Sequence, residues 1–76
     1  MAEKIVYDYS KLLGLMKEKG ITQYDLADAI NISEKSLSSK LNNNRNFKQA
    51  EIDLAVLFLK INDEDVTTYF FTHNVH

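Results

Sequence analysis

The feature that most constrains this chain is the stretch TQYDLADAINISEKSLSSKLN, from Thr22 to Asn42, which holds two short helical patterns separated by only a few residues. Apolar residues recur at helical spacing in each half of the stretch. Asn31 interrupts the first pattern, and Asn is one of the few residues besides Gly that tolerate the left-handed conformation of a tight turn. The stretch therefore predicts two helices joined by a tight turn.

Capping residues predict where these two helices begin. Thr22 followed three residues later by Asp25 is a capping-box pattern, with Asp in place of the usual Glu or Gln. Ser33 is a favourable N-cap for the second helix. Leu37 and Leu41 lie on one side of that helix and are expected to hold it against the fold. The expected helices cover residues 23–30 and 34–42.

The rest of the chain also predicts helices around a small core. Its 76 residues are enough for one domain, residues 1–76, and the absence of Pro favours helices. Short β-prone segments at the two ends, Ile5–Tyr7 and FFTHNVH, predict terminal strands that pair. The expected fold class is all-α with five helices and short terminal β-strands. The three further helices are expected at about residues 9–19, along the apolar run 50–61, and from residue 63 to about 70.

The run from residue 50 to residue 61 is apolar on more than one side. A helix of that kind is either central to the fold or half in an interface. The first stripe contains Ala50, Leu54, Leu57, Phe58 and Ile61. We expect the second stripe, with the aromatic residues near the C-terminus, to belong to the core, and a contact with a partner protein is its alternative role. These residues are Ile52, Val56, Leu59, Tyr69, Phe70 and Phe71.

Charge is distributed unevenly along the chain. The net charge is −2, yet the segment from Lys35 to Lys48 contains four cations and no acidic residue. Local charge matters more than the sum, because salt screens interactions beyond about 8 Å. The second helix of the pair also presents short, hydrogen-bonding side chains on its outer side, and a surface that approaches base edges needs such side chains. In helix-turn-helix proteins, helix pairs of this geometry place their second helix in the major groove of DNA, but similar pairs also occur in many α-bundles, where such a polar side is only solvated.

With these features in place, Thr22–Asn42 resembles the helix-turn-helix of the phage repressor/Cro superfamily. The residues that carry the resemblance are Gln23, Leu26-Ala27, Ile30, Ile32-Ser33, Leu37 and Leu41. The flanking segments resemble small Cro-like regulators of Gram-positive bacteria and their prophages. The resemblance implies a five-helix lambda-repressor-like domain that binds double-stranded operator DNA without a cofactor. It also implies a homodimer on a pseudo-palindromic site.

The resemblance further implies that one group of polar residues contacts the bases of DNA and another contacts its phosphates. The positions that read bases are Glu34, Lys35, Ser38 and Ser39. The positions that contact phosphates are Gln23, Lys40, Asn42, Asn44, Arg45 and Lys48. If about four cations per subunit neutralise phosphates, the slope of log affinity against log salt is about −3.6 per subunit.

The sequence leaves a second function open, that of an antirepressor or modulator that binds a partner repressor through the apolar surface of the last two helices. Glu34 repels phosphate, and the net charge is acidic. Both features are unusual for a small domain that binds DNA sequence-specifically. Asn31 stands where the superfamily usually has Gly, a change that we interpret as tolerated.

An enzyme or a metal protein is not expected. There is no Cys and no Gly-rich phosphate loop, and His73 and His76 have no evident third ligand. The N-terminus lacks the pattern of a signal peptide, and no apolar run reaches the length of a membrane span. We therefore expect a cytoplasmic regulator.

Overall fold

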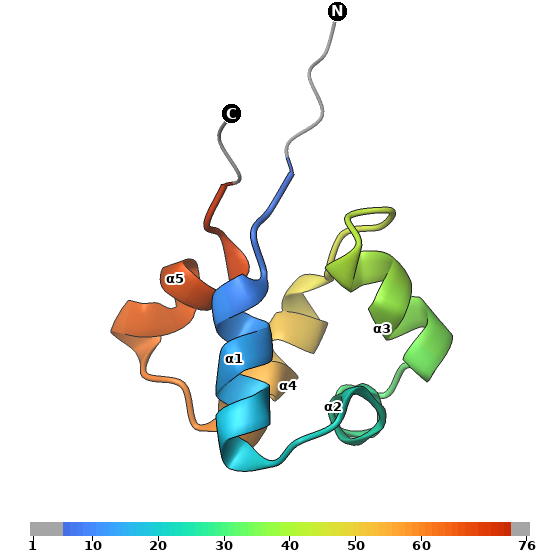
Figure 1. Ribbon diagram of the computed structural model, residues 1–76, viewed down its shortest axis with the longest axis horizontal. Helices are drawn as coiled ribbons and strands as arrows, with labels where there is room; N and C mark the ends of the chain where they lie inside the picture. Colours follow the sequence, from blue (N-terminus) through green and yellow to red (C-terminus); the bar gives the residue numbers. More distant parts are fainter. Residues whose placement is uncertain (1–5, 74–76) are drawn as a thin grey trace, which may run out of the picture.

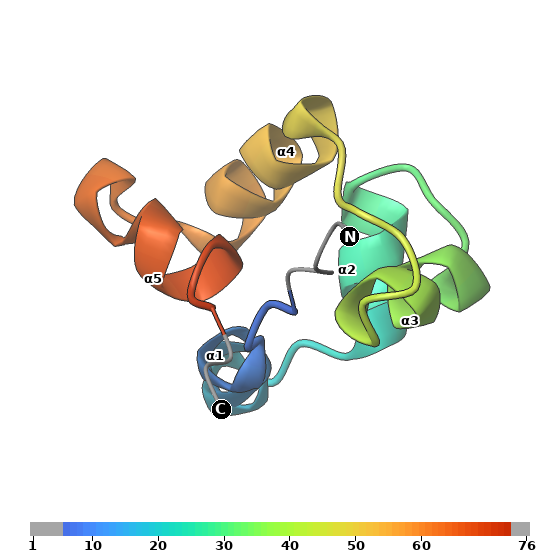
Figure 2. The ribbon, with the colours of Figure 1, turned by 90° about the horizontal axis from the view of Figure 1, so that it is seen from above.

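The computed structural model describes residues 6–73, and this part of the chain contains five α-helices and one short 3-10 helix. Figure 1 and Figure 2 show them in two perpendicular views. The all-α class with five helices is confirmed, and the first three helices lie within one residue of the expected limits. The elements are α1 (Ser10–Lys19), α2 (Gln23–Ala29), α3 (Glu34–Leu41), α4 (Gln49–Leu59), η1 (Asp63–Asp65) and α5 (Val66–Phe70).

The helices surround one core to which every α-helix contributes. α2 packs against both α3 and α4, while α1 packs against α5. Seen from above, α1 lies opposite α4, and α3 and α5 lie on opposite sides of the molecule (Figure 2). The burial of these apolar side chains is the main force that holds the short helices together. The core residues are Tyr9, Leu12, Met16, Leu26, Ala27, Ile30, Leu37, Ile52, Ala55, Leu59, Ile61 and Phe70.

Side-chain caps begin α2 and α3 as the sequence predicts. The Thr22 hydroxyl accepts a hydrogen bond from the Asp25 backbone N–H at 3.1 Å, and the Asp25 carboxylate accepts one from the Thr22 N–H at 3.0 Å. The Ser33 hydroxyl accepts a hydrogen bond from the Ser36 N–H at 3.0 Å. These bonds satisfy backbone donors that have no partner within the first turn of a helix.

Each of the first four helices is followed by a residue in the left-handed conformation. At Asn31 this conformation allows the next N–H, that of Ile32, to donate to the Ala27 carbonyl at 3.0 Å. This bond is typical of a Schellman motif, which satisfies carbonyls at a helix end. The predicted left-handed turn at Asn31 is therefore confirmed. The four residues and their φ angles are Gly20 (69°), Asn31 (63°), Asn43 (63°) and Lys60 (57°).

The structure decides which apolar stripe of α4 faces inward. Ile52 and Leu59 are buried, and so is Phe70 on α5, which excludes the alternative role of a partner contact for these three residues. Their burial follows from the packing of α4 against α2 and of α5 against α1. Of the first stripe, Ile61 is buried in the core, whereas Leu54, Leu57 and Phe58 reach the surface, with Leu57 75% exposed.

The two described ends of the chain meet at the top of Figure 1. Tyr7 and His73 form an isolated antiparallel bridge, and the Asp8 N–H donates to the Thr72 carbonyl at 2.7 Å. The Asn43 side chain fixes this end, because it accepts from the Tyr7 N–H at 2.8 Å and donates to the Tyr7 carbonyl at 3.0 Å. Pairing of the ends thus occurs within one chain, as a single bridge in residues 6–73. The predicted strands also included residues 5 and 74–76, which lie outside the described residues.

Candidate functional site

The outer side of α3 and the start of α2 form a shallow polar hollow of about 430 Å³. It brings together all four residues predicted to read bases and three of the six predicted to contact phosphates. Arg45 and Lys48, also predicted phosphate contacts, are exposed but do not line it. The lining residues are Gln23, Glu34, Lys35, Ser38, Ser39, Asn42 and Asn44.

The polar hollow carries little net charge. Lys35 is its cation and Glu34 is its carboxylate, and both side chains are exposed. Ser38 and Asn42 also engage each other, because the Asn42 amide donates to the Ser38 carbonyl at 2.9 Å and to its hydroxyl at 3.4 Å. The surface can form hydrogen bonds, but its own charges exert only a weak pull on phosphate.

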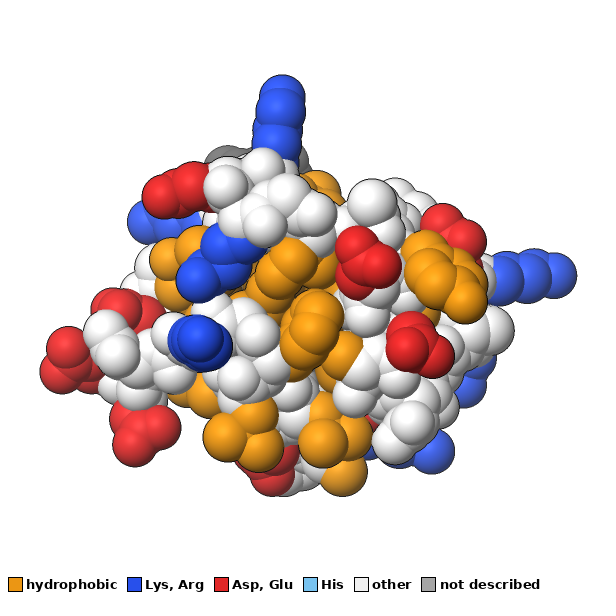
Figure 3. Space-filling view, turned by 90° about the horizontal axis from the view of Figure 1, so that it is seen from below, with side chains coloured by type: hydrophobic (Ala, Val, Ile, Leu, Met, Phe, Trp, Pro, Cys, Tyr) orange, Lys and Arg blue, Asp and Glu red, His pale blue; other side chains and the backbone are white. Residues whose placement is uncertain are grey.

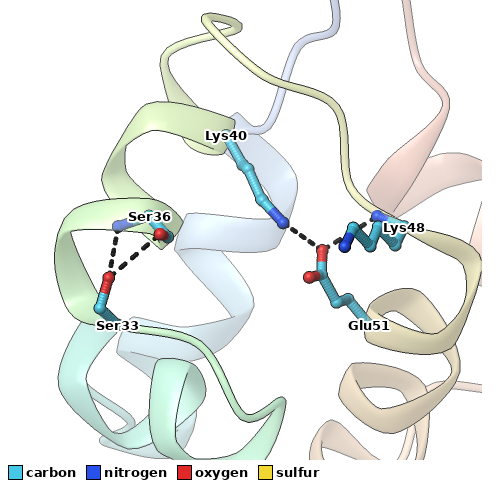
Figure 4. A network of polar contacts seen from close by, with 5 residues as sticks. All are labelled: Ser33, Ser36, Lys40, Lys48 and Glu51. Atoms are coloured by element: carbon cyan, nitrogen blue, oxygen red, sulfur yellow. Dashed lines mark hydrogen bonds and ion pairs between the residues drawn. The ribbon is translucent and has the colours of Figure 1, made fainter.

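Lys40 does not lie at this surface, and the expectation that it contacts phosphate is wrong. Only 2% of the residue is exposed, and its ammonium group donates a hydrogen bond to the Glu51 carboxylate of α4. The same carboxylate oxygen accepts from the Lys48 backbone N–H at 2.9 Å, as Figure 4 shows. The physical reason is pairing: Lys40 can turn inward because Glu51, eleven residues further along the chain, meets its charge there.

The environment of Glu51 favours its ionised form. Burial raises the pKa of this carboxyl, but the hydrogen bonds from the Lys40 ammonium and the Lys48 N–H, with the charges of both lysines, outweigh that effect. The pKa of Glu51 therefore lies below its ordinary value. At neutral pH the carboxylate is charged, and the ion pair ties α3 to α4.

A second hollow, which we call the apolar groove, lies between α2 and α4 and has a volume of about 610 Å³. Its α4 wall is apolar and its α2 wall carries two carboxylates. Figure 3 shows the underside of the molecule, where hydrophobic side chains gather across the middle, acidic side chains lie on both sides of them, and Lys or Arg side chains lie beside them on the left. The sequence shows which residues share a helix face in each wall, but it does not show that the two helices lie side by side. The lining residues are Asp25, Asp28, Ala29, Leu54, Leu57 and Phe58.

Both carboxylates of the apolar groove lie on the exposed side of α2. Hydrogen bonds from the Thr22 backbone N–H and hydroxyl hold the pKa of Asp25 below its usual value. Between residues 6 and 73, no ion pair neutralises Asp25 or Asp28. The α2 wall therefore presents negative charge to anything that enters the groove.

In the described part of the chain, no group of three or more His, Cys, Asp or Glu side chains is placed to hold a metal ion. His76, one of the two histidines near the C-terminus, lies outside the described residues. No helix within residues 6–73 has the length and apolar character needed to cross a membrane.

Comparison with models of protein families gives a match over residues 5–73 to a family described as a protein of unknown function, DUF739. The chain belongs to the DUF739 family. Among solved structures, it is similar to the solution structure of the modulator of repression (MOR) of the temperate bacteriophage TP901-1 from Lactococcus lactis. The two share 47% sequence identity with a TM-score of 0.72, over 92% of this chain and 95% of the other. Comparison with curated protein sequences gives no match.

This DUF739 chain is therefore a small phage-related protein that shares its fold with a modulator of repression. The resemblance to small phage regulators is confirmed at that level. Its finer part, the assignment to Cro-like helix-turn-helix proteins, stays a prediction, and so do the base-reading and phosphate-contacting roles of the residues in the polar hollow.

Proposed function

We propose that this protein modulates repression by binding a repressor protein, and that this binding lowers the occupancy of the operator. The observation that carries the proposal is the 47% identity with the TP901-1 modulator of repression over nearly the whole of both chains. Identity of that extent, together with a shared fold, makes a related role the simplest expectation.

The charges around α3 support this choice over direct operator binding. Pairing with Glu51 withdraws Lys40 from the surface, so Lys35, Arg45 and Lys48 are the cations left on this side. Three cations imply a salt slope of about −2.7 per subunit, weaker than the four-cation expectation. Glu34 beside Lys35 reduces the attraction further. Because phosphate contacts carry much of the affinity for DNA, this surface is a poor operator binder.

The exposed side of α4 supports a protein partner. Leu54 is 36% exposed, Leu57 75% and Phe58 41%. A contiguous apolar group on the surface of a small domain is typical of a contact with another protein. This surface belongs to α4, in agreement with the alternative that the sequence left open, although the side chains are those of the first stripe.

The experiment that tests the proposal uses the repressor encoded in the same phage or prophage genome, bound to its labelled operator. Adding this protein at equal concentration is expected to release most of the operator in a gel-shift titration. A control variant, Lys35→Ala/Ser39→Ala, removes two predicted base readers and is expected to release the operator as well as the wild type does. Unchanged occupancy at large excess would contradict the proposal.

A second candidate, direct operator binding, is favoured by one observation: all four predicted base readers line the same polar hollow. The same gel-shift assay without the repressor tests it. Selective binding of the operator by this protein alone, weakened by Lys35→Ala/Ser39→Ala, would support operator binding. Binding that does not distinguish the operator from a scrambled duplex would count against it.

A further inference from the structure

We infer that the apolar groove between α2 and α4 is the docking site for one amphipathic helix of the repressor. The apolar stripe of that helix lies on α4, and lysine or arginine residues at the edge of the stripe face α2. The inference rests on the proposed function, to which it adds the surface and the chemistry of the partner. Two observations support it: the residue composition of the two walls, and the helical spacing of the residues within each wall.

The α4 wall is a ridge suited to a helical partner. Leu54, Leu57 and Phe58 stand at positions i, i+3 and i+4 of one helix, so their side chains lie on one face. They are exposed while Ala55 and Leu59, on the opposite side of α4, are buried. Leu57 therefore adds little to the core, and the exposed parts of the ridge lose contact with water only when another molecule covers them.

The α2 wall gives the groove its charge preference. Asp25, Asp28 and Ala29 repeat the spacing i, i+3 and i+4, so the two carboxylates lie along one edge of the groove and Ala29 lies beside them. Ala29 is small and half-buried, which leaves room for a side chain from a partner. None of the described residues that line the groove is basic. Charge complementarity therefore calls for cations on the partner.

A second copy of this chain fits the groove poorly. In a two-fold symmetric contact the same patch meets itself. The Asp25 and Asp28 carboxylates of both copies would then surround the same apolar contact, and like charges placed together oppose association. The ridge also consists of only three side chains, much less than the roughly 800 Å² per partner of a typical stable interface. A single amphipathic helix in a groove is anchored by a few apolar residues at i, i+3, i+4 and i+7.

The partner helix can be described from these walls. A helix lying on the ridge contacts it through apolar residues at i, i+3 or i+4, and i+7. Lysine or arginine residues on the neighbouring stripe reach the carboxylates, since their long stems cover apolar surface while the charged ends remain near water. Charge sets the orientation of the helix and speeds encounter, whereas the leucine and phenylalanine contacts provide most of the affinity.

The test measures the affinity of the repressor for four forms of the full-length protein by calorimetry: wild type, Leu57→Ala, Asp28→Lys and the control Lys35→Ala. Leu57 and Asp28 are exposed and Lys35 lies in the polar hollow, so all three variants are expected to fold, as circular dichroism will verify. Leu57→Ala is expected to weaken binding roughly tenfold or more. Asp28→Lys is expected to weaken it about as much at low salt and less at high salt. Lys35→Ala is expected to leave it unchanged.

The outcomes separate this inference from the proposed function. Binding by the wild type that neither groove variant weakens would overturn the groove as the docking site and leave the proposed function standing. No binding by the wild type would overturn both. Sedimentation of the protein alone tests the second copy as occupant: a dimer that Leu57→Ala converts to a monomer would overturn the assignment to a repressor helix. A monomer in both forms supports it.

Discussion

The polar hollow and the apolar groove share α2 as a wall but differ in what they leave unsatisfied. In the hollow, Ser38 and Asn42 bond to each other, and the charges of Glu34 and Lys35 offset. In the groove, Leu57 and Phe58 remain exposed beside carboxylates that have no ion-pair partner among the described residues. The segment with the most recognisable sequence pattern is therefore not the surface that leaves large apolar side chains in contact with water.

The largest expected effect contrasts two lysines of α3. Lys40→Ala is expected to lower the free energy of unfolding by roughly 3–5 kcal/mol, because it leaves the Glu51 charge buried without its partner. Lys35→Ala at the exposed position is expected to change it by less than about 0.5 kcal/mol. Urea unfolding of both variants measures the contrast. Equal, small losses would mean that Lys40 is a surface residue and would restore it as a phosphate contact.

The next contrast uses two leucines of α4. Leu59→Ala removes a fully buried side chain and is expected to cost roughly 2–5 kcal/mol of stability. Leu57→Ala, on the apolar ridge, is expected to cost less than about 0.5 kcal/mol. Thermal and urea unfolding check the pair. A large loss of stability in Leu57→Ala would show that the ridge is part of the fold and not a free surface for a partner.

Two neighbouring asparagines give a smaller contrast. Asn43→Ala loses two hydrogen bonds to the Tyr7 backbone and places Ala at a positive φ, with an expected loss of about 2–3 kcal/mol. Asn44→Ala, in the exposed lining of the polar hollow, is expected to have almost no effect on stability. Amide exchange at Tyr7 should rise only in the Asn43 variant. If both variants were equally stable, the loop would not hold the chain terminus.

The smallest effect is a dependence on pH. The folded-state pKa of Glu51 lies below its ordinary value of 4.5, so its contribution to stability is complete above that pH and is lost as the pH falls through the lowered pKa. The double variant Lys40→Met/Glu51→Leu lacks this contribution but can remain folded, because an apolar pair replaces the ions. The wild type should therefore lose stability more steeply than the double variant below about pH 4.5. If the stability of the two proteins fell equally with pH, the ion pair with Lys40 would not stabilise the Glu51 carboxylate.

Much of the fold follows from local patterns in the sequence. The caps at Thr22 and Ser33 and the left-handed turn at Asn31 depend on residues within a few positions of each other, so the sequence is enough to predict them. For the same reason the limits of α1, α2 and α3 are close to those expected. Apolar spacing also indicates that α4 is apolar on two sides.

What could not be predicted depends on contacts between distant elements. Lys40 stands three residues after Leu37, so helical spacing places it near the inward side of α3, but a lysine there normally keeps its charged end in water, and only the approach of Glu51 from α4 explains its burial. The two stripes of α4 are both apolar, so their spacing does not reveal which one α2 and the rest of the core will cover. The apolar groove likewise arises where two helices meet. The sequence shows the residues of each wall separately but not that α2 and α4 lie side by side.

Docking of the repressor in the apolar groove is tested by mapping the amide chemical shifts of the ¹⁵N-labelled protein as unlabelled repressor is added. We expect the largest changes at Asp28, Ala29, Leu57 and Phe58, while amides of the polar hollow such as Ser39 and Asn44 stay nearly unchanged. The opposite result, with the groove unaffected and the changes concentrated at Lys35, Ser38, Ser39 and Asn44, would contradict this expectation. It would indicate that the repressor binds the surface formed by α3.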